Sequence, residues 1–410
     1  MKIAVIGGGI SGLGAAYMLS AKHEVDLYEK ESRLGGHART TMVQEDNKEF
    51  GVDTGFLVFN FQTYPLLTKL FEQLDVKIEK SDMSFGFWDK ASGVAYNAQT
   101  IGGMFFQKKN LFSWAHYKMI YDILAFNKKA NYDVDNDTPE LDKTLGEYIS
   151  VYTEAFKERY ILPMGAAIWS TPSDQMHNFP ARTFLQFFKN HGLLGVTTQH
   201  QWLTVSNGSI NYVNKIKEFI SGKIILNAAV QKVRRNNGTV EIVDDTGVHV
   251  YDKVIFALHA PDALKLLEDP SNEELEILSA FAYKENDALL HTDTNVLYPD
   301  KKIYAAWNYK NNAARDAVTL SYWINRLQNL ETKKEYFVSL NEIDNVGEVI
   351  ERINYEHPQF NVAAIDAQKR REEISGKRDT YYAGAYWRYG FHEDGLWSAN
   401  TIAKEFGCEL

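Results

Sequence analysis

The sequence predicts an α/β fold in which one domain is interrupted by another. Residues 2–40 read as strand, glycine turn, helix and strand, and residues 223–258 hold three β-rich runs. The last 31 residues end in an amphipathic helix followed by Gly407, a plausible helix cap. We expect these three blocks to form one domain, with the middle runs rejoining the first sheet.

The length and the intervening segments predict where the domains divide. At roughly 150 residues per domain, 410 residues give two or three domains. Residues 85–200 are rich in aromatic side chains and helical patterns, and residues 280–345 contain short strands. We therefore expect the first domain to comprise 1–84, 200–270 and 375–410. An inserted α+β domain is expected over 85–199 and 271–374.

Composition narrows the function classes. Subtracting 54 acidic from 44 basic side chains leaves a net charge of −10, which disfavours nucleic acid as a partner. The one cysteine, Cys408, excludes an intrachain disulfide and fits a reducing compartment. The apolar run at 3–6 stops at Gly7, unlike a signal peptide, and no apolar stretch reaches the ~18 residues that span a bilayer. We expect a cytoplasmic protein of open oligomeric state.

A dinucleotide-binding motif opens the chain. Gly7, Gly9 and Gly12 form G-x-G-x-x-G between a strand and a helix, and Glu29 closes the next strand. Gly7 permits a tight turn, Gly9 lets a pyrophosphate approach the backbone, and Gly12 lets helix and strand pack. Free amides at the helix N-terminus favour the phosphate charge, and Glu29 can accept hydrogen bonds from a ribose. The three glycines alone are weak evidence for such a site, but their position between a strand and a helix, with Glu29 after the next strand, predicts a dinucleotide site.

A second motif carries a resemblance to a known family. Arg33-Leu34-Gly35-Gly36-His37-Ala38-Arg39-Thr40 follows the ribose acid, and R-x-G-G-x-x-x-T there resembles the FAD-binding extension of the flavin amine oxidase superfamily, which includes protoporphyrinogen oxidase and phytoene desaturases. The resemblance implies FAD as cofactor. It also implies a two-dinucleotide-fold, Rossmann-like domain with an inserted α+β substrate domain. The cofactor contacts it implies in this region are Gly7, Gly9, Ile10, Ser11, Gly12, Glu29, Lys30, Arg33, Gly35, Gly36, His37 and Arg39.

The resemblance extends to the other two blocks. Val230 falls where these enzymes place a strand residue against adenine, and Ala257 lies where a strand end passes the dinucleotide. Near the C-terminus, Ala383-Gly384 and the run 390–396 resemble the motif that completes the site. A helix starting at Gly395 would direct its amides to one edge of the flavin ring. The contacts implied here are Gly384, Asp394, Gly395 and Leu396, and Asp394 is also a candidate helix cap.

Within the superfamily the chain is most similar to a bacterial branch of FAD-dependent oxidoreductases associated with cyclopropane-type fatty acid modification. The likeness rests on LPMGAAIWSTP (162–172), FFKNHGLL (187–194), HTDTNVLYP (291–299) and GAYWRYGFHEDGL (384–396). Together with the N-terminal motif these stretches span nearly the whole chain. They imply an apolar, lipid or fatty acyl substrate.

Several features bear on the reaction. Aromatic residues make up 13% of the chain, and those beside the C-terminal motif suggest a wall beside the flavin, so Trp387, Tyr389 and His392 are candidate substrate contacts. His392 is a candidate proton relay, with a structural histidine as the stronger interpretation. We find no equivalent of the lysine and aromatic pair typical of amine oxidases. Oxidation or desaturation of an apolar molecule by hydride transfer to flavin N5 is therefore expected. The catalytic acid or base and the electron acceptor stay open.

Residues 105–129 combine large apolar side chains with five lysines. This pattern suits a lip resting on the inner membrane surface as a peripheral contact. An ordinary amphipathic helix is the alternative and the more common case.

Three other functions stay open: a flavin-dependent amine oxidase, a nicotinamide-linked dehydrogenase, and a flavin-binding protein without catalysis. The nicotinamide class would need neither the arginine motif nor the C-terminal one. The eleven histidines show no ligand spacing with carboxylates, so no metal site is expected. Nucleophilic catalysis is not indicated, because G-x-S-x-G does not occur in the sequence.

Overall fold

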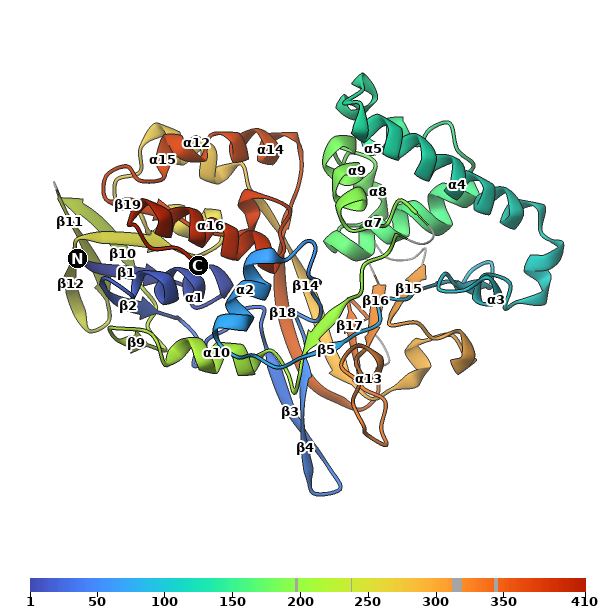
Figure 1. Ribbon diagram of the computed structural model, residues 1–410, viewed down its shortest axis with the longest axis horizontal. Helices are drawn as coiled ribbons and strands as arrows, with labels where there is room; N and C mark the ends of the chain where they lie inside the picture. Colours follow the sequence, from blue (N-terminus) through green and yellow to red (C-terminus); the bar gives the residue numbers. More distant parts are fainter. Residues whose placement is uncertain (196–197, 237, 312–318, 343–345) are drawn as a thin grey trace.

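The computed structural model describes residues 1–195, 198–236, 238–311, 319–342 and 346–410 and confirms the α/β class (Figure 1). A parallel five-stranded sheet has the order β19-β13-β1-β2-β9. Its strands are β1 (Lys2–Ile6), β2 (Glu24–Tyr28), β9 (Ile224–Ile225), β13 (Lys253–Phe256) and β19 (Thr380–Tyr382). The carboxyl ends of these strands therefore meet at one edge of the sheet.

Helices cover this sheet because its central strands are apolar along their length. Ile3, Val5 and Val25 are fully buried, as expected for a parallel sheet enclosed on both faces. Helix α1 (Ile10–Leu19) packs against the C-terminal helix α16 (His392–Glu405), which lies beside it in Figure 1. The two termini of the chain thus meet in one core.

Only part of the middle block rejoins this sheet, which corrects the expectation for residues 223–258. β9 and β13 do so, whereas β10 (Lys232–Asn236), β11 (Thr239–Asp244) and β12 (Gly247–Tyr251) form a separate antiparallel sheet. Only two residues separate each of these strands from the next along the chain, so each pairs with its neighbour before any distant strand.

A seven-stranded sheet forms the second β layer and runs β18-β14-β17-β16-β15-β6-β7. Its strands are β6 (Phe85–Asp89), β7 (Val94–Asn97), β14 (Ala282–His291), β15 (Trp307–Asn311), β16 (Thr319–Trp323), β17 (Phe337–Leu340) and β18 (Val349–Gln359). All seven fall within the predicted substrate segments, and all five strands of the parallel sheet fall within the predicted cofactor segments. The domain division itself stays a prediction.

Helices dominate residues 101–190. The longest is α4, and Figure 1 shows it at the outer edge of the molecule, far from β11 and β12. None of the described helices is both long and apolar enough to cross a bilayer. The helices of this region are α3 (Ile101–Met104), η1 (Lys108–Phe112), α4 (Trp114–Asp135), η2 (Pro139–Asp142), α5 (Leu145–Tyr148), α6 (Glu154–Phe156), η3 (Lys157–Ile161), α7 (Leu162–Trp169), α8 (Ser173–Met176) and α9 (Ala181–Asn190).

Shorter elements connect the two sheets. The two strand pairs are β3 (Thr40–Glu45) with β4 (Lys48–Asp53) and β5 (Ile78–Lys80) with β8 (Leu203–Val205). The remaining α-helices are α2 (Pro65–Gln73), α10 (Ile210–Lys217), α11 (Ala260–Leu266), α12 (Asn272–Ser279), α13 (Ile324–Leu327), α14 (Val362–Lys369) and α15 (Arg371–Ile374).

The C-terminal helix begins three residues earlier than predicted, at His392 rather than Gly395. The Asp394 carboxylate accepts a hydrogen bond from the backbone N–H of Phe391, the residue that caps the helix. The backbone N–H of Asp394 donates in turn to the carbonyl oxygen of Phe391 at 3.0 Å, and together these bonds hold residues 392–394 in the first turn. Gly407 follows the last turn with φ +65°, as the predicted cap requires.

A buried histidine lies in the seven-stranded sheet. His291 on β14 is fully buried, with its Nε2 2.8 Å from Ser339 Oγ on β17. Its Nδ1 accepts a hydrogen bond from the backbone N–H of Asp293, so the ring is neutral with its proton on Nε2. Burial lowers the pKa of His291 to about 4.

This lowered pKa predicts a stability loss in acid. An unfolded histidine takes up a proton near pH 6.5, whereas His291 in the fold does so only near pH 4. The free energy of unfolding should therefore fall as pH drops through this window, by about 2 kcal/mol from pH 7 to pH 5 for this one residue. The free energy of unfolding can be measured with urea at pH 7 and at pH 5. Between these two pH values it should fall by about 2 kcal/mol less in His291→Gln than in the unsubstituted protein. Equal losses would contradict the assignment.

Candidate active site

One large cavity lies between the parallel sheet and the helical region. Its volume is about 1600 Å³, above the roughly 300–1,000 Å³ typical of a pocket for one small molecule. Its lining begins at the glycine turn after β1 and reaches α3, α4 and α7. The cavity therefore has room for two molecules placed end to end.

The glycine turn is shaped by two close backbone contacts. A Cβ on Gly7 would lie 2.3 Å from the carbonyl oxygen of Ala257, and one on Gly12 would lie 1.8 Å from that of Gly7. Gly7 also has φ +107°, which favours glycine. Gly9 differs, because a Cβ there would meet nothing within 4 Å, although Gly9 lines the cavity. Gly7 and Gly12 therefore allow close packing, whereas Gly9 leaves space for a ligand.

Glu29 lies at the end of β2 and lines the cavity. One carboxylate oxygen accepts the backbone N–H of Gly8 at 2.8 Å, and the other accepts that of Glu31 at 2.8 Å. These two bonds fix the carboxylate beside the glycine turn. A carboxylate held in this way suits the hydroxyl groups of a ribose.

The arginine motif folds back over the glycine turn. Arg33 donates to the backbone oxygen of Gly36 at 2.9 Å, and the backbone N–H of Gly35 donates to Gly8 at 2.8 Å. Gly36 has φ +56°, and a Cβ there would lie 3.0 Å from Gly9 Cα. Arg39 pairs with Glu351 of β18. The two glycine motifs thus form one wall, which a side chain on Gly36 would disrupt.

The structure brings most of the predicted cofactor contacts to the cavity wall. The lining includes Gly7, Gly9, Ile10, Ser11, Glu29, Lys30, Arg33, Gly36, His37, Arg39, Val230, Ala257 and Gly384. Five others lie behind the wall. Gly12 and Gly35 support the turn, Gly395 packs against Ile10 and Ser11, Leu396 is fully buried, and Asp394 caps α16.

The predicted aromatic wall is only partly at the cavity. Tyr389 and His392 line it, together with Phe391. Trp387 instead packs in the core against Phe281 and donates its indole N–H to Tyr382 O at 3.0 Å. It lies in a short 3-10 turn, Ala385–Trp387, whose geometry sends Trp387 away from Tyr389.

His392 has the environment of a structural residue. Its ring stacks on Phe56 with centroids 3.9 Å apart, and its Nε2 lies 3.0 Å from the Tyr212 hydroxyl. Burial lowers the pKa of His392 to about 3. The ring is therefore neutral at physiological pH, which favours the structural interpretation over a proton relay.

Sequence reasoning missed a group of residues from β18 and from the loop after β13. Tyr355 and His357 of β18 line the cavity, and His37 stacks on Tyr355 with centroids 4.8 Å apart. Burial lowers the pKa of His357 to about 4. No local sequence motif marks β18. His259, by contrast, lies two residues after Ala257, at a strand end that the sequence already predicted to pass the cofactor.

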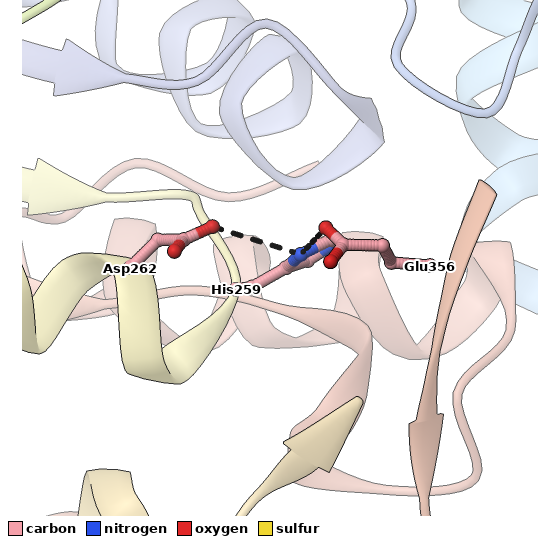
Figure 2. A group of neighbouring side chains, drawn as sticks. All are labelled: His259, Asp262 and Glu356. Atoms are coloured by element: carbon pink, nitrogen blue, oxygen red, sulfur yellow. Dashed lines mark ion pairs between the residues drawn. The ribbon is translucent and has the colours of Figure 1, made fainter. Parts of the chain in front are cut away.

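His259 forms a cluster with Asp262 and Glu356 at the cavity wall (Figure 2). Its Nδ1 lies 3.1 Å from Glu356 and 3.8 Å from Asp262, and the three candidate ligand atoms lie within 4.8 Å of one another. The expectation of no metal site overlooked this group because Glu356 lies far along the chain. The direct contact of His259 Nδ1 with Glu356 accounts for the cluster without an ion, so we assign no metal to it.

The far end of the cavity is lined mainly by apolar side chains. Helix α3 contributes Ile101 and Met104, and α4 contributes Tyr117, Ile120, Ile123, Leu124 and Asn127. Helix α7 adds Met164, Ala167, Ile168 and Trp169. No side chain from these three described helices brings a formal charge to the lining. We call this end the apolar chamber.

The open space at Gly9 generates a prediction. In Gly9→Val the fold should persist, because Gly9 has φ −76° and nothing stands within 4 Å of its Cβ position. The side chain should occupy ligand space and weaken FAD binding at least tenfold, measured by titrating apoprotein with FAD. Gly102→Val is the control, since its nearest neighbour is Thr100 Oγ1 at 3.8 Å. Unchanged affinity in Gly9→Val would place the cofactor elsewhere.

Known structures share this fold. A proposed protoporphyrinogen oxidase from Exiguobacterium sp. 255-15 has a TM-score of 0.71 and 19% identity, with 99% of this chain and 98% of that chain covered. The CLA-producing fatty acid isomerase from P. acnes has a TM-score of 0.72 and 14% identity, with 98% of each chain covered. Cyclohexylamine oxidase from Brevibacterium oxydans IH-35A has a TM-score of 0.67 and 14% identity, with 99% of each covered. No curated protein matches the sequence.

The family model for flavin-containing amine oxidoreductases matches residues 10–340, which is most of the chain. The open space at Gly9, the fixed Glu29 carboxylate and the volume of the cavity fit FAD. The chain therefore belongs to the flavin-containing amine oxidoreductase family and is an FAD-dependent oxidoreductase.

Proposed function

We propose that this oxidoreductase oxidises an apolar substrate, a lipid or fatty acyl compound, in the apolar chamber. The observation that carries the proposal is the neutral lining supplied by α3, α4 and α7. A charged substrate would lose its hydration there without gaining a counter-charge from these helices. A long apolar chain would instead be stabilised by every methylene that it buries.

The chain's own residues supply binding, orientation and exclusion of water. When bound, FAD accepts a hydride at N5. Tyr389 and Phe391 lie where the apolar chamber meets the C-terminal motif, and Phe187 of α9 stacks on Phe391 with centroids 5.0 Å apart. This aromatic contact stiffens the wall against which a substrate rests.

His191 extends this wall and is held neutral. It lines the cavity, stacks on Phe187 with centroids 3.8 Å apart, and places Nδ1 2.9 Å from the backbone oxygen of Phe187. Burial lowers the pKa of His191 to about 4. A neutral imidazole keeps this wall of the chamber free of positive charge.

An amine is the alternative substrate, and the carboxylates of the lining bear on it. Glu29 and Glu31 lie at the glycine end, Asp82 pairs with Arg326 at 2.6 Å, and Asp262 and Glu356 pair with His259. Among the described lining residues, none of these acids comes from the helices of the apolar chamber. A cationic amine would therefore find no counter-charge on these three helices, which favours the apolar substrate. A nicotinamide-linked or non-catalytic function lacks comparable support.

Flavin reduction tests the substrate class directly. Under anaerobic conditions, long-chain acyl compounds, free or as phospholipids, should bleach the absorption band of the bound flavin, whereas putrescine and cyclohexylamine should not. Bleaching by the amines alone would replace the proposal with amine oxidation. Bleaching by neither group would reject the apolar substrate class as stated.

A charge placed in the apolar chamber should impair substrate binding selectively. Ile123→Asp puts a carboxylate on the lining face of α4, where an apolar chain would have to desolvate it. The substrate concentration that half-saturates flavin reduction should rise at least tenfold, with FAD affinity unchanged. Tyr132→Asp on the same helix is the matched control, because Tyr132 is 63% exposed. Equal effects in both variants would show that the chamber does not hold the substrate.

A further inference from the structure

A stripe of large apolar side chains is exposed along α4. Trp114, Tyr117, Tyr121 and Leu124 are 81%, 45%, 62% and 52% exposed. Their spacings of three, four and three residues place them on one face of the helix. We call these four residues the α4 stripe. Exposed aromatic side chains gathered on one face are unusual in a protein surrounded only by water.

The segment before α4 extends this surface. Leu111 and Phe112 of η1 are 45% and 88% exposed. Ser113 accepts the backbone N–H of His116 and so fixes the start of α4 directly after these two side chains. The exposed apolar surface therefore continues from η1 into the α4 stripe, and helix α4 lies at the outer edge of the molecule in Figure 1.

The α4 stripe is also the rim of the apolar chamber. Tyr117 and Leu124 are exposed and line the cavity at the same time. Ile120 and Ile123, on the adjoining face of α4, continue the lining inward. Ile101 of α3 is 82% exposed and also lines the cavity. An apolar path thus leads from the surface of the protein into the chamber.

The charge of this region opposes that of the rest of the chain. Residues 101–129 hold five lysines and one aspartate, a net charge of +4. Lys118 pairs with Asp122, and Lys129 pairs with Asp133 and Glu140, so Lys108, Lys109 and Lys128 are the lysines that can face a partner. Since the whole chain carries −10, the remainder carries −14. Lys128 continues the α4 stripe one turn beyond Leu124, and Lys108 and Lys109 lie in η1 beside Phe112. Local positive charge around exposed aromatic side chains complements an anionic lipid surface.

We propose that η1 and the α4 stripe dock on an anionic lipid bilayer, with the aromatic side chains in the interface and the lysines at the headgroups. The apolar chamber then opens toward the acyl chains. A second copy of this chain is a poorer occupant, because the lysines at positions 108, 109 and 128 of the two copies would repel each other. The docking proposal does not depend on the proposed function. Only the nature of the molecule that enters the chamber rests on the proposed function.

Vesicle flotation of the FAD-loaded, full-length protein tests the docking without any turnover. At low salt the protein should float with vesicles of phosphatidylglycerol and phosphatidylcholine. With vesicles of pure phosphatidylcholine the protein should not float. Its binding to the anionic vesicles should weaken as the salt concentration rises. In Phe112→Ser/Trp114→Ser/Tyr121→Ser, which leaves the lining residues intact, the partition constant should fall at least tenfold. The matched control is Val248→Ser/Val250→Ser/Val362→Ser, whose side chains are 53%, 55% and 63% exposed elsewhere on the surface.

A fluorescent label gives a second measurement that does not depend on these variants folding normally. The sole cysteine, Cys408, is 5% exposed, so a thiol label would react mainly at a cysteine introduced by Phe112→Cys or, as control, Val362→Cys. The label at position 112 should shift to the blue on addition of anionic vesicles, and that at position 362 should not.

Three results would overturn the docking: no flotation with anionic vesicles, equal flotation of the triple variant and its control, or a label at 112 that stays in water. Dimerisation without lipid that the triple variant abolishes would assign the surface to a second copy instead. If docking holds while acyl compounds fail to reduce the flavin, the proposed substrate is wrong and the membrane contact stands.

Discussion

The site depends on the close backbone packing of the glycine turn. Gly12 lets α1 lie against the carbonyl of Gly7, and Gly7 in turn lies against Ala257 at the end of β13. A methyl group on Gly7 would separate the turn after the first strand from β13, which comes some 250 residues later in the sequence, and one on Gly12 would push α1 away from that turn. This contact aligns the carboxyl ends of the strands, and with them Gly9, Glu29 and the loop that carries His259. The C-terminal helix closes the arrangement through Gly395, which packs on Ile10 and Ser11.

From that edge the cavity changes character along its length. The glycine end offers backbone groups, a fixed carboxylate and the arginine motif, which suit a dinucleotide. The other end is built from helices whose lining side chains are apolar or uncharged. The same α4 helix supplies both the chamber lining and the exposed α4 stripe, so chamber and surface form one continuous apolar path. A substrate class and a membrane contact thus follow from one helix, by separate arguments.

Site residues that belong to short sequence motifs could be predicted from the sequence. Gly9, Glu29 and Arg33 stand in motifs whose spacing follows from a strand, a turn and a helix, and the structure places all three at the cavity. Tyr355 and His357 could not be found, because β18 reaches the site only by pairing with β14 across the second sheet. Trp387 and Tyr389 are two residues apart, yet one lies in the core and the other at the cavity, because an irregular turn separates them. The helix start at His392 depended on the Asp394 cap, and sequence alone suggested that cap without fixing its position.

The central claim is that one cavity holds FAD at the glycine end and an apolar molecule in the chamber between α4 and α7. The most direct measurement is a crystal structure of the FAD-loaded protein with a long-chain acyl compound added. We expect the adenosine ribose beside Glu29, the pyrophosphate at Gly9, and acyl density along Ile123 and Ile168. Flavin outside the glycine turn, or acyl density confined to the outer surface with the chamber filled by side chains, would contradict the central claim.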